Sequence, residues 1–431
     1  MIKRWLASDG LAKHVMTLAS GTVAAQLLIV AITPILFRLY GQKELDALGA
    51  FSALFFTLVG VSALRMEQVI PIAKDKSQAI HILRLSILVA LATSLLILII
   101  LLILGNGIGG ILNLPILALY PWVLPLSLAG GAAYMICTLW FTREQQFKIT
   151  ARTTVAQAIG MAVTQVGGFY VMKGHAQLAL VLGLAIGRSS GVVSFLQALR
   201  KVDEWRQPWD FAEMRGLFSR YRSFPYYSAP STLANSAGLQ LPLLMLVSNF
   251  PLGSTAAFYA STRFLGSPMT LIGAAVAQAY QGQAARYVRE NPAALLPLFD
   301  RTLRKLGLAS LAVCPFGLSA PFWMPAFLGP NAGDAGIWTA MMTPMFCLQL
   351  VCSPVSMTAQ LLEKLQGQLA LDILRVVLTA ACFGLAAHYG STATIAVGCY
   401  SGSMIVVYLA SLVFYRKCAA SASGADQASQ S

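Results

Sequence analysis

The chain has 431 residues, of which 57% are hydrophobic and only 11% are charged, and its formal net charge is +14. A soluble globular domain carries about 25% charged residues, so this composition excludes that class. Runs of about 20 apolar residues without the alternation typical of strands predict an all-α integral membrane protein, in which each helix satisfies its own backbone hydrogen bonds.

The apolar runs predict twelve transmembrane spans. The first six are residues 15–37, 47–73, 84–105, 117–140, 152–172 and 177–198, and the other six are residues 223–249, 254–282, 305–328, 335–362, 370–389 and 392–415. We therefore expect an N-terminal six-helix lobe (1–198), a cytoplasmic linker loop (199–222), a C-terminal six-helix lobe (223–415) and a disordered cytoplasmic tail (416–431). The linker carries six basic residues between the two halves.

The positive charge is concentrated in alternate loops. Of the 30 lysines and arginines, 23 lie in loops on one side of the predicted membrane, and the opposite loops contain only Arg38, Lys43 and Lys173. This asymmetry indicates that both termini face the cytoplasm. It also explains the high net charge without a basic patch for nucleic acid, so we expect no nucleic-acid partner.

The two halves resemble each other. A short outside turn precedes the second span of each half, which opens with GAFSAL (49–54) or AAFYAS (256–261). Because six spans separate the halves, the repeat is predicted to be parallel, with a transport pathway in the cleft between the lobes.

Four basic residues remain within the spans: Arg65, Arg188, Arg263 and Arg375. Arg188 and Arg263 are too deep to reach the surface easily, and an arginine at such a depth costs at least about 2.5 kcal/mol. A wet cavity or a binding partner is expected to compensate that cost. Arg65 and Arg375 lie nearer the cytoplasmic ends, where a snorkelling or purely structural role is an equal alternative.

Two acidic residues accompany the shallower arginines. Glu67 is two residues from Arg65, and Asp372 is three residues from Arg375, which places that second pair on one helix face. Arg188 and Arg263 have no such neighbour in sequence. The interior is therefore predicted to be net positive and suited to an anionic cargo, such as a phosphate or an acidic sugar.

Polar residues at helical spacing predict a lined path. The strongest set is on the eighth span, with weaker sets on the tenth and first: Arg263, Ser267, Thr270, Gln278 and Gln281; Gln349 and Ser353; and Gln26. Hydrogen bonding between helices is an equally good explanation for these side chains.

Other patterns predict no chemistry. The seven cysteines and four histidines lack metal-ligand or disulfide spacing, and GNGIGG (105–110) follows a membrane helix rather than a strand. No Walker A sequence or catalytic constellation is visible. The sequence thus predicts a transporter without a bound cofactor rather than an enzyme.

Three segments resemble one family. TPILFRLYG (33–41), ALRMEQVIPIA (63–73) and the long stretch at 230–287 are similar to bacterial oligosaccharide flippases of the Wzx type, within the multidrug/oligosaccharidyl-lipid/polysaccharide exporter superfamily. Met66, between Arg65 and Glu67 at the end of the second span, departs from the aromatic residue that is commoner at this position in that family.

The resemblance implies a flippase of the bacterial inner membrane. Its cargo would be an undecaprenyl-pyrophosphate-linked oligosaccharide for O-antigen, capsule or exopolysaccharide. It also implies a cationic lumen, coupling to a proton or sodium gradient, and polymerase and chain-length proteins as partners. The alternatives are a multidrug exporter, which would want a deep carboxylate that residues 17–37 lack, and a polymerase, ligase or scaffold of the same pathway.

Overall fold

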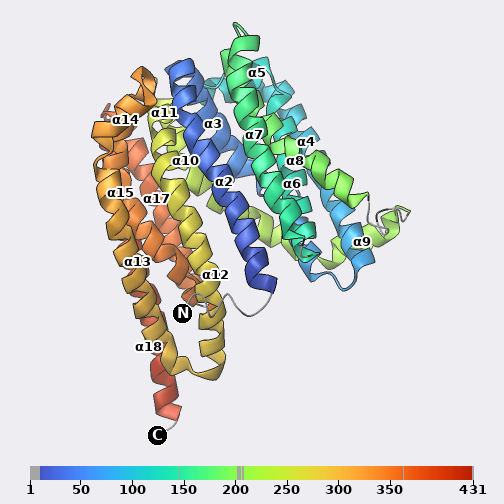
Figure 1. The fold of residues 1–431 in the computed structure, drawn as a ribbon, viewed down its shortest axis with the longest axis vertical. Coiled ribbons are helices and arrows are strands. Elements are labelled where there is room, and N and C mark those ends of the chain that lie inside the picture. The colour runs from blue at the N-terminus through green and yellow to red at the C-terminus, as the bar shows by residue number, and fades with distance from the viewer. Residues whose placement is uncertain (1–9, 145, 201–204, 206–207, 363, 430–431) are drawn as a thin grey trace. The chain divides into compact units, whose positions relative to one another are not determined.

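The computed structural model describes residues 10–144, 146–200, 205, 208–362 and 364–429, and all regular structure in these residues is helical. The chain divides into two compact units, residues 1–248 and 249–431. Helix α10 therefore groups with the first unit, although the sequence assigns its residues to the second lobe. Figure 1 colours the helices of both units by their position in the sequence.

The first unit contains helices of very different lengths. They are α2 (Gly10–Leu39), α3 (Gln42–Val59), η1 (Met66–Ile72), α4 (Lys76–Ile111), α5 (Ile116–Leu119), α6 (Val123–Arg143), α7 (Phe147–Val171), α8 (Ala176–Leu199), α9 (Phe211–Arg220), η3 (Phe224–Ser228) and α10 (Ala229–Asn249). Helix α8 packs against α3, α6 and α7, and α7 also packs against α2.

Helices α7 and α8 approach each other closely because glycines line their contact. A Cβ atom built on Gly187 would lie 2.5 Å from the Cβ of Met161 and 2.9 Å from its Cα. Small residues allow such close backbone approach in membrane proteins, where packing replaces the hydrophobic effect as the driving force for helix association.

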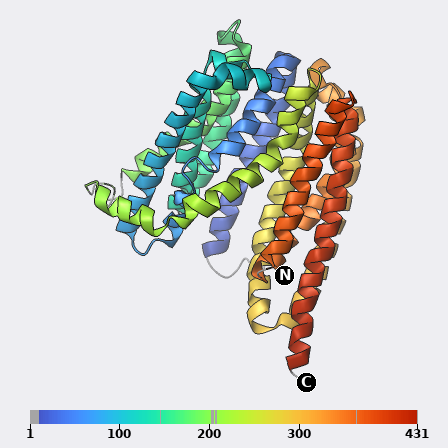
Figure 2. The same cartoon turned by 180° about the vertical axis from the view of Figure 1, so that it is seen from behind.

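The second unit is organised around helix α15, which has the most neighbours among its helices. Its elements are α11 (Ser254–Ser261), η4 (Thr262–Gly266), α12 (Ser267–Glu290), η5 (Pro292–Ala294), α13 (Leu295–Leu318), α14 (Ala320–Leu328), η6 (Pro330–Ala332), α15 (Ala335–Val355), α16 (Met357–Leu361), α17 (Leu365–His388) and α18 (Ala393–Ser429). Helices α12, α13 and α18 pack on α15. Helix α17 lies beside α18, as the orange and red helices at the front of Figure 2 show.

The predicted spans all correspond to helical segments. Within the described residues, seven helices are long and apolar enough to cross a membrane, and the bent pair α13–α14, with a 59° angle between its helices, could add an eighth. The other four predicted spans correspond to α3, α7, α10 and the interrupted helix α11–η4–α12, which are more polar or shorter. The all-α class is confirmed.

Two helices run past their predicted ends. Helix α4 continues through Gly105–Gly110 to Ile111, where the sequence predicts an outside loop. Helix α18 continues to Ser429, whereas the sequence predicts a disordered tail; alanines are frequent there, and alanine has the highest helix propensity.

Candidate functional site

Arg188 lies on α8 in the first unit, beside two aromatic rings of α3. Its guanidinium carbon is 5.8 Å from the ring centre of Phe55 and 5.3 Å from that of Phe56, and the side chain is half-buried. Its backbone carbonyl accepts a hydrogen bond of 2.8 Å from Gln157 on α7. The aromatic faces favour a cation at this position, so the charge is held between helices.

Arg65 and Glu67 form an ion pair where α3 gives way to η1. Arg65 Nη1 is 3.7 Å from Glu67 Oε1, and only 3% of the Glu67 side chain is exposed, against 23% of Arg65. Leu64 and Arg65 both adopt left-handed backbone conformations, with φ of 50° and 63°. Such conformations cost free energy in residues other than glycine and occur preferentially at functional sites.

Arg143 fixes the segment that carries Glu67, a role that sequence reasoning missed. Its Nη1 donates to the carbonyls of Ile70 and Ala73, each at 2.9 Å, and its Nη2 donates to the carbonyl of Asp75 at 3.2 Å. The sequence places Arg143 among the loop charges, and no sequence signal marks backbone carbonyls as its acceptors.

Arg263 lies in a π-helical turn, η4, in the second unit. The amide of Ser267 donates to the carbonyl of Thr262, five residues earlier, because Pro268 has no N–H and its ring crowds the carbonyl of Phe264. Segment η3 has the same arrangement before Pro230, where Ala229 donates to Phe224. Such π-turns are frequent at functional sites.

The Arg263 side chain is 8% exposed, and its guanidinium carbon is 5.0 Å from the ring centre of Tyr259. Among the described residues, no carboxylate lies within ion-pair distance of it. The buried positive charge that the sequence predicts in this span is therefore not neutralised within the described part of the chain.

The predicted polar path is only partly buried. Gln26, Ser267 and Gln349 are half-buried, Thr270, Gln281 and Ser353 are exposed, and the side chain of Gln278 lies outside the described part of the structure. Thr270 donates to the carbonyl of Gly266 in its own chain segment at 2.8 Å, so that hydroxyl is occupied locally. Ser353 lies beside Gly273, where α15 faces α12.

Arg375 and Asp372 form the second predicted ion pair, on α17. Their closest atoms, Nη2 and Oδ1, are 3.2 Å apart, and the two side chains are 20% and 45% exposed. The structure thus joins Arg65 with Glu67 and Arg375 with Asp372, and it places Arg188 and Arg263 in different units. Within the described residues, no group of three His, Cys, Asp or Glu side chains could hold a metal ion.

Apolar helices with arginines buried among them define this chain as a multi-pass membrane protein. Residues 72–324 match the model of a family described as "Polysaccharide biosynthesis protein". Because that match covers more than half of the chain, the protein belongs to this family, and the predicted membership in a polysaccharide-exporting family is confirmed. No curated protein matches the sequence.

Solved transporters share the fold. An inward-facing multidrug resistance MATE family transporter of the MOP superfamily aligns with a TM-score of 0.73 at 14% identity, covering 94% of this chain and 95% of that one. The lipid II flippase MurJ in an inward closed conformation aligns with a TM-score of 0.66 at 14% identity, covering 93% and 87%. These folds have 12 transmembrane helices in two lobes, which confirms the predicted architecture.

Proposed function

We propose that this protein is a transporter that moves an undecaprenyl-pyrophosphate-linked oligosaccharide across the bacterial inner membrane, supplying repeat units for O-antigen, capsule or exopolysaccharide. The family match supports a role in polysaccharide synthesis. The fold shared with MATE and MurJ transporters supports translocation by alternating access between the two lobes.

One observation carries the choice of cargo. Arg263 is buried and has no carboxylate within ion-pair distance among the described residues. An arginine in that environment is stabilised by an incoming anion, and its fork of N–H donors matches phosphate oxygens. A pyrophosphate-linked substrate provides such an anion.

The other arginines extend this proposal. Arg188, held over Phe55 and Phe56, would offer a second attraction for the pyrophosphate or for acidic sugars. Arg65 and Glu67 would form an entrance at the cytoplasmic end of the path, where their ion pair could open to admit the head group. A proton or sodium gradient would drive the cycle.

A multidrug exporter for organic cations is the principal rival, because the same fold serves MATE proteins. Such a cargo favours a buried carboxylate without a cationic neighbour. The buried carboxylate of Glu67 instead lies 3.7 Å from the guanidinium of Arg65, which favours the anionic cargo. A polymerase, ligase or scaffold of the same pathway would need neither the half-buried Arg188 nor the buried Arg263.

The test compares a deletion strain that carries the wild type, Arg263→Ala or the exposed control Arg301→Ala. We expect the wild type and the control to restore surface polysaccharide. Arg263→Ala should leave lipid-linked intermediates in the inner leaflet at a normal protein level. Normal polysaccharide in the Arg263→Ala strain would contradict the proposal, and unchanged polymer with increased sensitivity to cationic dyes in the deletion strain would favour a drug exporter.

A further inference from the structure

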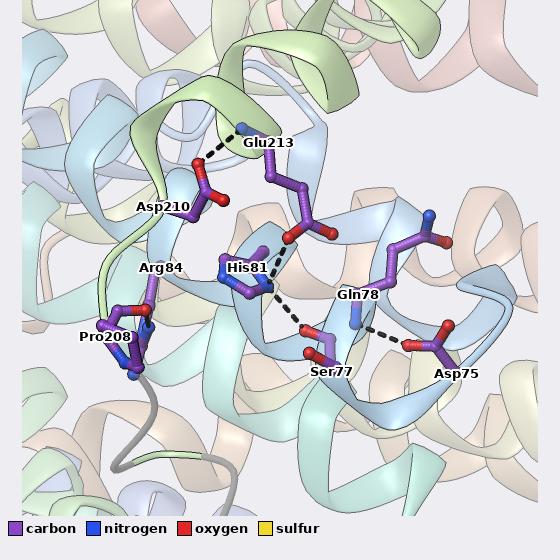
Figure 3. Close-up of polar contacts among 8 residues, drawn as sticks. All are labelled: Asp75, Ser77, Gln78, His81, Arg84, Pro208, Asp210 and Glu213. Carbon is purple, nitrogen blue, oxygen red and sulfur yellow. Dashed lines mark hydrogen bonds and ion pairs between the residues drawn. The ribbon is translucent and has the colours of Figure 1, made fainter.

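Helix α9 is a short amphipathic helix that is fixed to the start of α4. Met214 and Leu217 are buried, with 2% and 5% of their surfaces exposed, and Leu217 joins the same apolar cluster as Ile80 and Leu83 of α4. Asp210 caps α9 by accepting a hydrogen bond from the amide of Glu213 at 2.9 Å. The carboxylate of Glu213 lies 3.4 Å from Nδ1 of His81 (Figure 3).

Arg84 of α4 holds the residues that precede α9 against α4. Its side chain is almost fully buried, Nη1 donates to the carbonyl of Pro208 at 3.1 Å, and Nη2 donates to that of Trp205 at 2.6 Å. The guanidinium also lies 5.4 Å from the Trp205 ring centre and 5.1 Å from that of Trp209. These contacts fix the orientation of α9, because backbone and side-chain partners both hold it (Figure 3).

Positive charge and exposed aromatic rings lie on α9 and directly beside its two ends. Arg215, Arg220 and Arg222 are exposed, and none of them forms an ion pair with a described residue. Trp209 and Phe211 are 46% and 66% exposed, and Phe211 and Arg215 are one helical turn apart. Aromatic rings beside arginines are typical of helices that lie in the membrane interface.

The position of α9 along α4 places it at the edge of the membrane. Both His81 and Arg84 lie in the first turns of α4, which begins at Lys76 and is a candidate span as far as Ile111. A helix anchored to those turns lies where the span leaves the lipid (Figure 1). This end belongs to the side that the basic loops are predicted to face.

We infer that α9, together with Trp209 and Arg222, is a binding surface for acidic phospholipid head groups of the leaflet on the basic side. The arginines would bind the lipid phosphates, and Trp209 and Phe211 would enter the boundary between head groups and acyl chains. Acidic lipids attract lysine and arginine at such a surface with roughly a fivefold gain in affinity for each residue. A soluble protein partner is less favoured, because Phe211 would lie at the level of the lipid head groups, where such a partner would not cover its ring.

The experiment uses the full-length protein in lipid nanodiscs of phosphatidylcholine, with or without phosphatidylglycerol. Amide hydrogen exchange of the peptide that covers α9 is measured for the wild type and for Arg215→Gln/Arg220→Gln/Arg222→Gln. The matched control is Arg301→Gln/Arg304→Gln/Lys305→Gln, which removes three exposed charges from α13. We expect phosphatidylglycerol to slow exchange in the wild type and the control, and high salt to reverse this effect.

The triple variant on α9 should lose this response, because removing three arginines weakens binding to acidic lipid by about a hundredfold. Its exchange in phosphatidylcholine alone should equal that of the wild type, which shows that Met214 and Leu217 still hold the helix. A second variant, Phe211→Ala, which leaves the contact between Arg84 and Trp209 in place, should respond more weakly to phosphatidylglycerol than the wild type. Equal exchange of the wild type in both lipids, or protection only by an added soluble cell fraction, would overturn the inference.

Discussion

Arg143 shows how a single side chain can hold a segment that is distant from it in the sequence. Its two terminal nitrogens reach four carbonyls at and beyond the end of η1, where a helix leaves acceptors without partners. A lysine carries one compact ammonium and cannot reach the same set of acceptors. The segment that positions Glu67 therefore depends on arginine rather than on positive charge alone.

We expect Arg143→Lys to lower the free energy of unfolding by about 2 kcal/mol, because hydrogen bonds from a charged donor are lost. Thermal or denaturant unfolding in detergent measures this change. The exposed Arg152 of α7 provides the control, since Arg152→Lys should leave stability unchanged. Similar unfolding curves for both variants would show that the carbonyl contacts of Arg143 contribute little.

The sequence predicts buried arginines correctly where depth in a span is the signal, as for Arg263. Arg84, the first residue of the predicted third span, is counted among the charges of the preceding loop, yet only 1% of this residue is exposed. The acceptors of Arg84 and Arg143 are backbone carbonyls, and every residue has one, so no pattern of side chains marks them. The left-handed conformation of Leu64 and Arg65 was likewise unpredictable, because neither residue favours it.

The two π-turns, η3 and η4, each interrupt a helix at a proline. In each, a proline removes one helical hydrogen bond, and the residue before it bonds five residues back, which widens the turn. Arg263 lies within the widened turn of η4, immediately before α12.

Pro268→Ala should convert η4 to a regular α-helix, because alanine restores the missing N–H. We expect stability to be equal or higher, while transport falls severalfold, since Arg263 then points in a different direction. Complementation of the deletion strain, together with thermal unfolding, checks both effects. Pro344→Ala, at an exposed proline inside α15, is the control and should not alter transport; unchanged transport by Pro268→Ala would separate the π-turn from function.

The contact between α7 and α8 leaves no room for one added methyl group at Gly187. Gly187→Ala places a methyl group 2.9 Å from the Cα of Met161, a backbone atom, so the helices must move apart. We expect a loss of about 2 kcal/mol in unfolding free energy, as is typical of overpacked cores. Gly167→Ala on α7 has open space at its Cβ and should be neutral in the same assay; equal melting temperatures would contradict this packing.

The length of the apolar runs predicted the spans well, but the ends of the helices and the short helix α9 were harder to predict from the sequence. GNGIGG suggests a turn, yet α4 continues through it, because glycine does not prevent a helix whose neighbours are strongly apolar. Helix α9 was missed within the basic linker. Its signal was present, since Asp210 followed by Glu213 is a capping pattern at the start of a helix.

For the whole molecule, the distribution of lysine and arginine predicts the orientation. Both ends of the chain should lie on the cytoplasmic side, with the turn at residues 250–253 on the other side. A fluorescent protein fused after Ser431 should fluoresce, whereas alkaline phosphatase inserted at that turn should be active. Active phosphatase at the C-terminus would contradict the predicted orientation.

The twelve-helix class follows from composition, because lipid permits few alternatives for an apolar chain. The division into two units does not follow from composition. Helix α10 groups with the residues before it, and its sequence does not indicate this grouping. The cargo can be predicted only in part from the sequence. The buried positive charge predicts an anionic cargo, whereas the choice of sugars would depend on side-chain contacts that hydropathy does not record.

The length of α4 has a consequence for the surrounding bilayer. The whole helix would be about 54 Å long, whereas the hydrocarbon core is about 30 Å thick. Its continuous apolar run, residues 85–104, would be about 30 Å long. Many of its leucines and isoleucines are exposed, including Leu91, Leu95 and Ile103, so lipid must cover them. The apolar run therefore matches the hydrocarbon core without any thickening of the bilayer, and the polar first turns and the glycine-rich last turns of α4 extend into the head-group regions on either side.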